Sequence, residues 1–169
     1  MGYTTEFEGK ITVEPPLSAE EIAYLKLFAT TRRMDRTRGP YFVEGTGSYG
    51  QDHDSDILNY NVSPKGQPGL WCQWEPSEDG TAIEWDGGEK FYDSEQWMKY
   101  LIDHFLKPNC LAKSELPFLQ ANHVLNGVIN AQGEENDDVW RLVVEDNRVF
   151  REDAVITRQY SPGARKEIP

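Results

Sequence analysis

The sequence predicts an α+β fold, in which two helices pack on one face of an antiparallel sheet. Three observations predict it. Segments with alternating apolar and polar residues stand near both ends of the chain, two amphipathic helical segments lie between them, and short polar turns join neighbouring strand segments. Alternating strands bury one face and leave the other wet, and helices can cover the buried face of such a sheet.

The first strand and the first helix carry the clearest local signals. Residues 3–13 alternate with period two, and two prolines end this strand. Ser18 then begins a helix, because Ser18 and Glu21 match a capping box, in which a serine and a glutamate three residues later bond to the first helical N–H groups. Apolar residues at helical spacing continue the helix to about residue 29.

The middle of the chain is expected to contain a loop, a hairpin and a second helix. Residues 44–69 hold five glycines and little periodicity, which is typical of a long and often functional loop. Residues 70–75 and 82–86 are expected to pair as a hairpin. Asp93 is the expected N-cap of the second helix, in which apolar residues recur at helical spacing.

Three further strands are expected at residues 123–131, 139–145 and 148–150. The first six elements then follow the order of a split β-α-β arrangement, so a ferredoxin-like sandwich with extra C-terminal strands fits the sequence. We expect one α+β domain over residues 1–160 and a flexible tail over residues 161–169.

Composition favours a cytoplasmic protein that binds neither nucleic acid nor membrane. The 169 residues carry a net charge of −12, which repels nucleic-acid backbones and anionic lipids and favours solubility. The sequence shows no signal peptide and no run of eighteen apolar residues. Cys72 and Cys110 are expected to be reduced thiols rather than a disulfide framework.

A cluster of four arginines directly after the first helix is the main positive feature of this acidic chain. A guanidinium group binds phosphate or carboxylate through two hydrogen bonds, so the cluster predicts a site for an anion or an acidic partner. Two alternatives stay open: the helix dipole favours cations at a C-terminus, and the cluster can pair with the chain's own acidic residues at 52–56. The arginines are Arg32, Arg33, Arg36 and Arg38.

Two motifs in the glycine-containing loop fail the tests for cofactor or metal binding. The spaced glycines at 45–50 match a dinucleotide pattern, but the acidic residues that follow would repel a phosphate and form no amphipathic helix. The alternating carboxylates at 52–56, which flank His53, resemble part of a calcium loop, but Ile and Ser stand where Gly and Glu are needed. We therefore expect no metal and no cofactor.

The expected hairpin combines tryptophans with carboxylates. Trp71, Trp74 and Trp85 lie in the same segment as Glu75 and Glu84. Rings beside carboxylates can form a pocket for a base, a sugar or a cation, and paired carboxylates can act as acid and base. The alternative is an ordinary strand pair, with one face in the core and the other in water.

We expect a binding or interaction protein without catalytic activity, whose partner is another protein or a second copy. The alternative is an enzyme that handles a small molecule or a nucleotide, with its site between residues 41–60 and the tryptophan hairpin. In that enzyme Arg33 or Arg36 would hold an anionic small molecule. Asp52, Glu75 or Glu84 would act as acid or base. The candidate residues are Arg32, Arg33, Arg36, Arg38, Tyr41, Asp52, His53, Tyr60, Trp71, Trp74, Glu75 and Glu84.

Four stretches resemble a family of small uncharacterised bacterial and phage proteins. They are QPGLWCQW at 67–74, DGTAIEWDGGEKFY at 79–92, residues 97–108, and LNGVINAQGEENDD at 125–138. The resemblance extends over most of the chain, to about residue 150. The family has no established activity, so the resemblance implies a compact cytoplasmic single-domain protein and transfers no functional residue.

Overall fold

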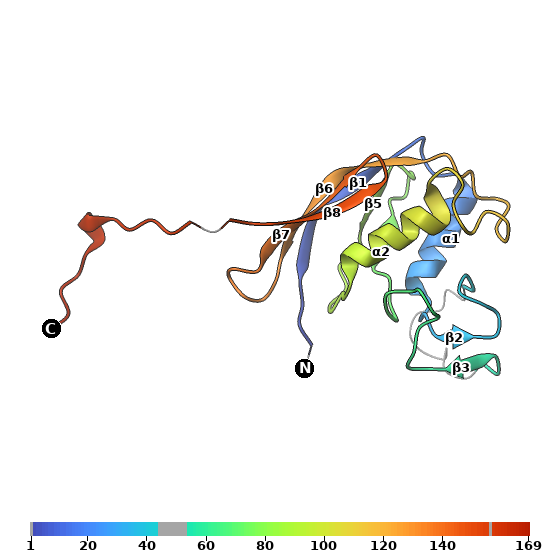
Figure 1. The fold of residues 1–169 in the computed structure, drawn as a ribbon, viewed down its shortest axis with the longest axis horizontal. Helices are drawn as coiled ribbons and strands as arrows, with labels where there is room; N and C mark the ends of the chain where they lie inside the picture. Colours follow the sequence, from blue (N-terminus) through green and yellow to red (C-terminus); the bar gives the residue numbers. More distant parts are fainter. Residues whose placement is uncertain (1, 44–53, 156) are drawn as a thin grey trace.

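The computed structural model describes residues 2–43, 54–155 and 157–169. It confirms the predicted α+β class, with a six-stranded antiparallel sheet and two helices (Figure 1). The strands are β1 (Glu6–Glu14), β2 (Asp35–Arg36), β3 (Ile57–Asn59), β4 (Trp74–Pro76), β5 (Ala82–Trp85), β6 (Val124–Gln132), β7 (Val139–Glu145) and β8 (Arg148–Asp153). The helices are α1 (Ala19–Thr30) and α2 (Ser94–Leu101), which continues as a π-helical turn, Ile102–Leu106.

The strand order in the large sheet is β4-β5-β1-β6-β7-β8. β1 lies between β5 and β6 and is antiparallel to both. The chain passes from β1 through α1 to β4, with β5 between these two strands, and from β5 through α2 to β6, with β1 between them. This order is the one that a split β-α-β arrangement requires. β7 and β8 extend it as the expected C-terminal strands.

The core lies between one face of this sheet and the two helices. Phe7, Ile11 and Val13 alternate along β1 and are each at most 9% exposed. Phe28 of α1 and Trp97 of α2 are fully buried, with their ring centroids 5.9 Å apart. Rings at this separation and in edge-to-face contact add to the free energy gained by burying apolar surface.

The two helix starts differ. At α1 the predicted capping box is confirmed: Glu21 donates its N–H to Ser18 Oγ at 3.2 Å, and Ser18 donates its N–H to Glu21 Oε1 at 3.0 Å. At α2 the predicted cap is wrong, because Asp93 has a left-handed backbone (φ 56°) and its side chain makes no capping hydrogen bond. Phe91 and Ser94, on either side of it, are both buried.

The segment expected to be a long loop contributes to a second, small sheet. β2 and β3 pair with each other, with Asp35 opposite Asn59 and Arg36 opposite Ile57. Strands of two and three residues are too short for alternation to predict them. The glycine pattern at 45–50, together with Asp52 and His53, lies outside the described residues.

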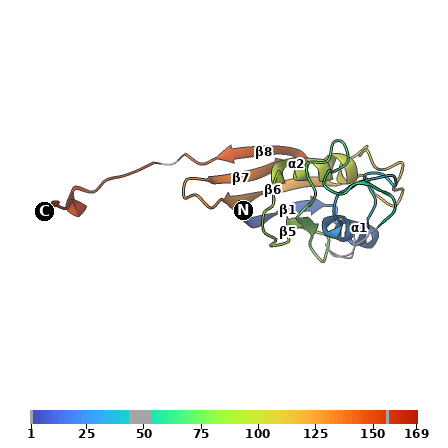
Figure 2. The same cartoon turned by 90° about the horizontal axis from the view of Figure 1, so that it is seen from below.

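Beyond β8 the chain leaves the sheet. Figures 1 and 2 show residues 157–169 running away from the other elements, and all of them are exposed. A short 3-10 turn, Pro162–Ala164, is the local structure there. Within the described ranges, no helix is long and apolar enough to cross a membrane.

Candidate functional site

Arg33, a member of the predicted cluster, belongs to the interior. Its side chain donates hydrogen bonds to the carbonyls of Pro40 and Phe42, and its Cζ lies 4.2 Å from the centre of the Phe28 ring. The residue is 2% exposed, and burial lowers the pKa of Arg33 to about 10. Arg33 therefore supports the segment after α1 from inside and does not present a surface for an anion.

Arg36 and Arg38 pair with acidic residues of the same chain. Arg36 Nη1 lies 2.9 Å from Asp54 Oδ2 and 3.2 Å from Asp56 Oδ1, and the Arg36 side chain is 1% exposed. Arg38 Nε lies 3.3 Å from Asp56 Oδ2 and is exposed. The alternative in which the cluster pairs with the chain's own acidic segment is confirmed for these two arginines. The pairs hold β2 and the start of β3 together.

Arg32 has a third environment. Its Cζ lies 4.0 Å from the centre of the Tyr60 ring, and its Nε donates to the Tyr60 carbonyl at 3.2 Å. Arg32 also lines a hollow of about 560 Å³ together with Trp71. The structure thus brings together three of the predicted contact residues, and we call this feature the Arg32–Trp71 hollow.

Three segments form the Arg32–Trp71 hollow: Arg32, which follows the C-cap of α1, residues 69–73 and residues 89–93. Gln73 Nε2 donates to the Glu89 carbonyl at 2.8 Å and joins the second segment to the third. The lining residues are Arg32, Gly69, Leu70, Trp71, Gln73, Glu89, Lys90, Tyr92 and Asp93.

The segment at residues 89–93 is anchored in the core by the buried ring of Phe91. The Phe91 ring centroid lies 5.0 Å from that of Trp74 and 5.9 Å from that of Phe7, in edge-to-face contact with both. Lys90 and Asp93 adopt left-handed backbone conformations, with φ of 58° and 56°. For residues other than glycine such conformations cost about 1–3 kcal/mol and are often found at functional sites. This strained turn places Lys90 and Asp93 at the hollow.

The charge of the hollow differs from that of the whole chain. Arg32 and Lys90 are balanced by Glu89 and Asp93, so its charged lining residues sum to zero, against −12 for the chain. Leu70, Trp71 and Tyr92 supply apolar surface. Aromatic walls with a neutral rim of charges suit a large apolar or aromatic group that has polar neighbours.

The other tryptophans of the hairpin belong to the core. Trp74 is 1% exposed and its Nε1 donates to the Ser94 carbonyl at 2.7 Å. Trp85 is opposite Trp74 in the β4–β5 pair and packs against the core. Glu75 and Glu84 are opposite each other in the same pair, and burial raises the pKa of Glu75. In this hairpin the two tryptophans therefore face the core, as the alternative predicted, while Glu75 and Glu84 on the other face are half-buried rather than fully in water.

Tyr41, another predicted contact residue, braces the segment after β2 against α2. Its hydroxyl lies 2.7 Å from His104 Nδ1, and the His104 ring stacks on Tyr100 with 3.8 Å between centroids. Burial lowers the pKa of His104, so the ring is neutral near pH 7 and its Nδ1 can accept from the tyrosine hydroxyl. Gln67 adds a second brace, donating to the Tyr100 hydroxyl at 2.9 Å.

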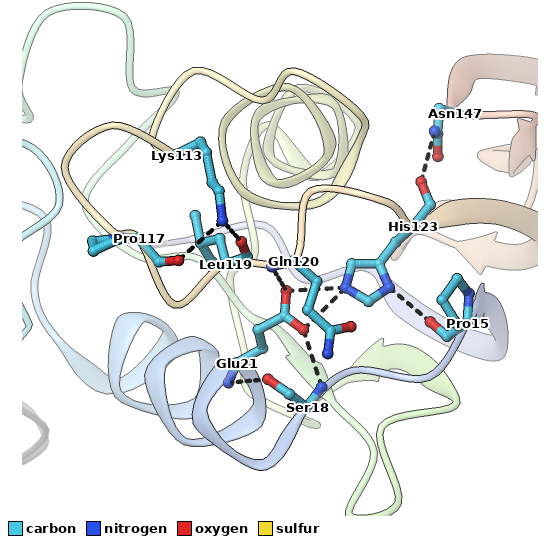
Figure 3. Close-up of polar contacts among 9 residues, drawn as sticks. All are labelled: Pro15, Ser18, Glu21, Lys113, Pro117, Leu119, Gln120, His123 and Asn147. Carbon is cyan, nitrogen blue, oxygen red and sulfur yellow. Dashed lines mark hydrogen bonds and ion pairs between the residues drawn. The ribbon is translucent and has the colours of Figure 1, made fainter.

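A second polar cluster, drawn in Figure 3, is closed to solvent. His123 Nε2 lies 2.9 Å from Glu21 Oε2, and His123 Nδ1 lies 2.7 Å from the Pro15 carbonyl oxygen. Both side chains of the Glu21–His123 pair are 0% exposed. The Gln120 N–H donates to the same carboxylate at 3.2 Å, and Ser18 contributes the capping bond.

Both ring nitrogens of His123 face oxygen acceptors, so the ring is doubly protonated when both bonds form. Burial alone would lower the pKa of His123, but the bonds to Glu21 and Pro15 outweigh it, and the pKa is raised. Burial alone would raise the pKa of Glu21, but the bonds from His123, Ser18 and Gln120 outweigh it, and the pKa is lowered. This arrangement is a closed ion pair that joins the ends of three segments, and substrate cannot reach it.

Sequence reasoning missed Glu89, Lys90 and Tyr92, because a connection before a helix carries no periodicity. It also missed the Glu21–His123 contact, which joins residues 102 positions apart. Among the residues that the structure describes, no group of three or more His, Cys, Asp or Glu side chains can hold a metal ion.

No protein-family model matches the chain, and comparisons with curated proteins and with solved structures give no match either. The resemblance to small bacterial and phage proteins therefore stays a prediction.

Proposed function

We propose that this chain is a protein-binding module and that the Arg32–Trp71 hollow is its contact site. The observation that carries the proposal is the meeting of Arg32, Trp71 and Tyr92 around one hollow of about 560 Å³. Arginine, tryptophan and tyrosine are the residue types that dominate the binding energy of protein interfaces, where they surround pockets that are emptied of water on binding.

The lining indicates the chemistry of the partner. Leu70, Trp71 and Tyr92 favour a large apolar side chain as the anchor. Lys90 can pair with a carboxylate beside that anchor, and the lining as a whole carries no net charge, unlike the acidic chain. We therefore expect a partner segment with an aromatic or aliphatic anchor next to an acidic residue.

The enzyme alternative has less support from the described residues. Of its three acid and base candidates, Asp52 lies outside the described residues, and Glu75 and Glu84 lie opposite each other on the hairpin and do not line the hollow. Arg33 and Arg36, its anion-binding candidates, are bonded to backbone carbonyls and to carboxylates of the same chain. General acid–base catalysis requires such groups to converge on one substrate.

Site-specific photo-crosslinking in the natural host cells tests the proposal. A photoreactive benzoylphenylalanine replaces Tyr92, which is 53% exposed, and in a matched control it replaces Leu111, which is 64% exposed and is not part of the hollow. We expect an adduct of discrete mass at position 92 that is absent at position 111. Mass spectrometry of the adduct identifies the partner.

A second substitution makes this test specific for the hollow. Trp71→Ala in the photoreactive variant removes the largest apolar wall, so the adduct at position 92 should fall at least about tenfold. Circular dichroism checks that the fold is kept. Equal adducts at both positions, or an adduct at position 92 that is indifferent to Trp71→Ala, would show that the hollow binds no protein.

A further inference from the structure

β8 forms one edge of the large sheet. Among the described residues it pairs with β7 alone, and Figure 2 shows it at the border of the sheet. The opposite edge, β4, has three residues, whereas β8 has six residues. An exposed edge presents unbonded N–H and C=O groups that can bind another strand.

The structure shows which backbone groups of β8 are unpaired. Ala154 N–H donates to the Val139 carbonyl at 2.9 Å, in register with the β7–β8 pair. Backbone groups alternate in direction along an antiparallel strand, so even-numbered residues of β8 bond to β7. The N–H and C=O groups of Val149 and Arg151 therefore point outward, away from the sheet.

The side chains of β8 also divide by face. Arg151 lies on the face that carries the helices, with its guanidinium 4.2 Å from the Trp140 ring and Nη1 2.8 Å from Glu95 of α2. Arg148, Phe150 and Glu152 alternate with it and lie on the open face. The open face of β8 therefore carries, in order along the strand, the positive charge of Arg148, the ring of Phe150 and the negative charge of Glu152.

We propose that two copies of this chain pair β8 with β8, antiparallel, about a two-fold axis at Phe150. This register places Arg148 opposite Glu152 of the second copy, at both ends of the contact, and places the two Phe150 rings opposite each other. Val149 and Arg151 of the two copies then exchange four N–H···O bonds. The pairing joins two six-stranded sheets into one and keeps both helix layers on the same side.

Neighbouring contacts support this register. Phe150, 41% exposed, continues an apolar row of the open face, because it pairs with Val143 and Val143 pairs with Val128. Glu152 already lies 2.5 Å from Arg141 within its own chain, so Arg148 of the second copy would place a second cation beside it. A shift by one residue would place Val149 and Arg151, whose N–H and C=O groups point outward, opposite even-numbered residues of the second copy whose groups already bond to β7.

Five paired residues make a small interface, and two chains of charge −12 repel each other. We therefore expect a dimer that forms reversibly at protein concentrations on the order of 100 µM.

Disulfide trapping tests the register. In the proposed dimer only residue 150, on the two-fold axis, lies opposite the same residue of the second copy. The Cα atoms of such a pair are about 4.5 Å apart, which a disulfide can bridge. Phe150→Cys should therefore give a covalent dimer under mild oxidation. Arg148→Cys is the matched control, because its two copies would be roughly 13 Å apart. Cys72 and Cys110 are 0% and 4% exposed and do not compete. We expect cross-linking at position 150 to be at least tenfold faster than at position 148, and equal rates would overturn the register.

Charge reversal tests the association itself, by sedimentation velocity over a concentration series. Arg148→Glu and Glu152→Arg each place like charges opposite each other twice, so each variant alone should stay monomeric. In an equimolar mixture the two variants restore both Arg–Glu contacts and should form a mixed dimer. A wild type that stays monomeric at about 500 µM, variants that associate as the wild type does, or a mixture without dimers would each overturn the proposal.

Discussion

Glu21 and His123 stand 102 positions apart in the chain, yet His123 Nε2 lies 2.9 Å from the Glu21 carboxylate and both side chains are fully buried. A buried ion pair stabilises a fold only when the remaining hydrogen-bonding positions are also satisfied. Here the Pro15 carbonyl and the N–H groups of Ser18 and Gln120 satisfy them. The pair therefore joins the start of α1 to the segment that leads into β6.

Removing the carboxylate should destabilise the protein strongly. Glu21→Gln leaves His123 without its buried counter-charge, and we expect the free energy of unfolding to fall by about 3 kcal/mol. Glu20→Gln is the matched control, because Glu20 is the exposed neighbour in the same helical turn, and it should change stability by less than about 0.5 kcal/mol. Urea unfolding measures both, and similar values would show that the pair contributes nothing.

The same pair predicts a pH dependence. The raised pKa of His123 means that its contribution is present below the ordinary value of 6.5 and is lost as the pH rises through the folded value. The lowered pKa of Glu21 means that its contribution is present above 4.5 and is lost as the pH falls. The stability difference between wild type and Glu21→Gln should therefore be largest between about pH 4.5 and 6.5. A difference that is constant from pH 4 to pH 9 would contradict this assignment.

Arg36 and Arg38 should differ although they are two residues apart. Arg36→Met leaves the carboxylates of Asp54 and Asp56 without their buried cation and should lower the free energy of unfolding by about 3 kcal/mol. Arg38→Met removes an exposed pair and should cost less than about 1 kcal/mol. Chemical denaturation of the two variants checks this, and equal losses would show that the difference in burial between the two arginines does not affect stability.

Substitution of Trp74 should destabilise the fold, whereas substitution of Trp71 should mainly affect binding at the Arg32–Trp71 hollow. Trp74→Ala removes a core ring that is 1% exposed and should cost about 3–5 kcal/mol. Trp71→Ala removes a half-buried wall of the Arg32–Trp71 hollow, and its cost should be roughly 1 kcal/mol. Thermal unfolding followed by circular dichroism distinguishes them. If Trp71→Ala unfolds as readily as Trp74→Ala, the hollow is part of the core.

Substitutions at the starts of α1 and α2 should change the free energy of unfolding in opposite directions. Ser18→Ala removes a capping hydrogen bond and should cost about 1 kcal/mol. Asp93→Gly relieves a left-handed backbone and should stabilise the protein by up to about 1 kcal/mol. A loss of stability in Asp93→Gly, measured by urea unfolding, would show that the Asp93 side chain caps α2 after all.

Local pattern was enough to predict the framework of this protein. Alternation predicted β1 and the antiparallel sheet, and the spacing of Ser18 and Glu21 predicted the start of α1. These features depend on residues two to four positions apart, so a single sequence contains them. The same reasoning predicted Asp93 as a cap, and the backbone conformation there showed that residue type alone does not decide a helix start.

The sequence by itself determined the α+β class, the capped first helix and the acidic charge of this chain. Only the tertiary structure decided that Trp74 lies in the core while Trp71 lines a hollow, that Arg36 is buried while Arg38 is exposed, and that Glu21 meets His123. The physical reason is that burial depends on the segments that pack against a side chain, and these segments come from distant parts of the chain whose approach no local spacing records.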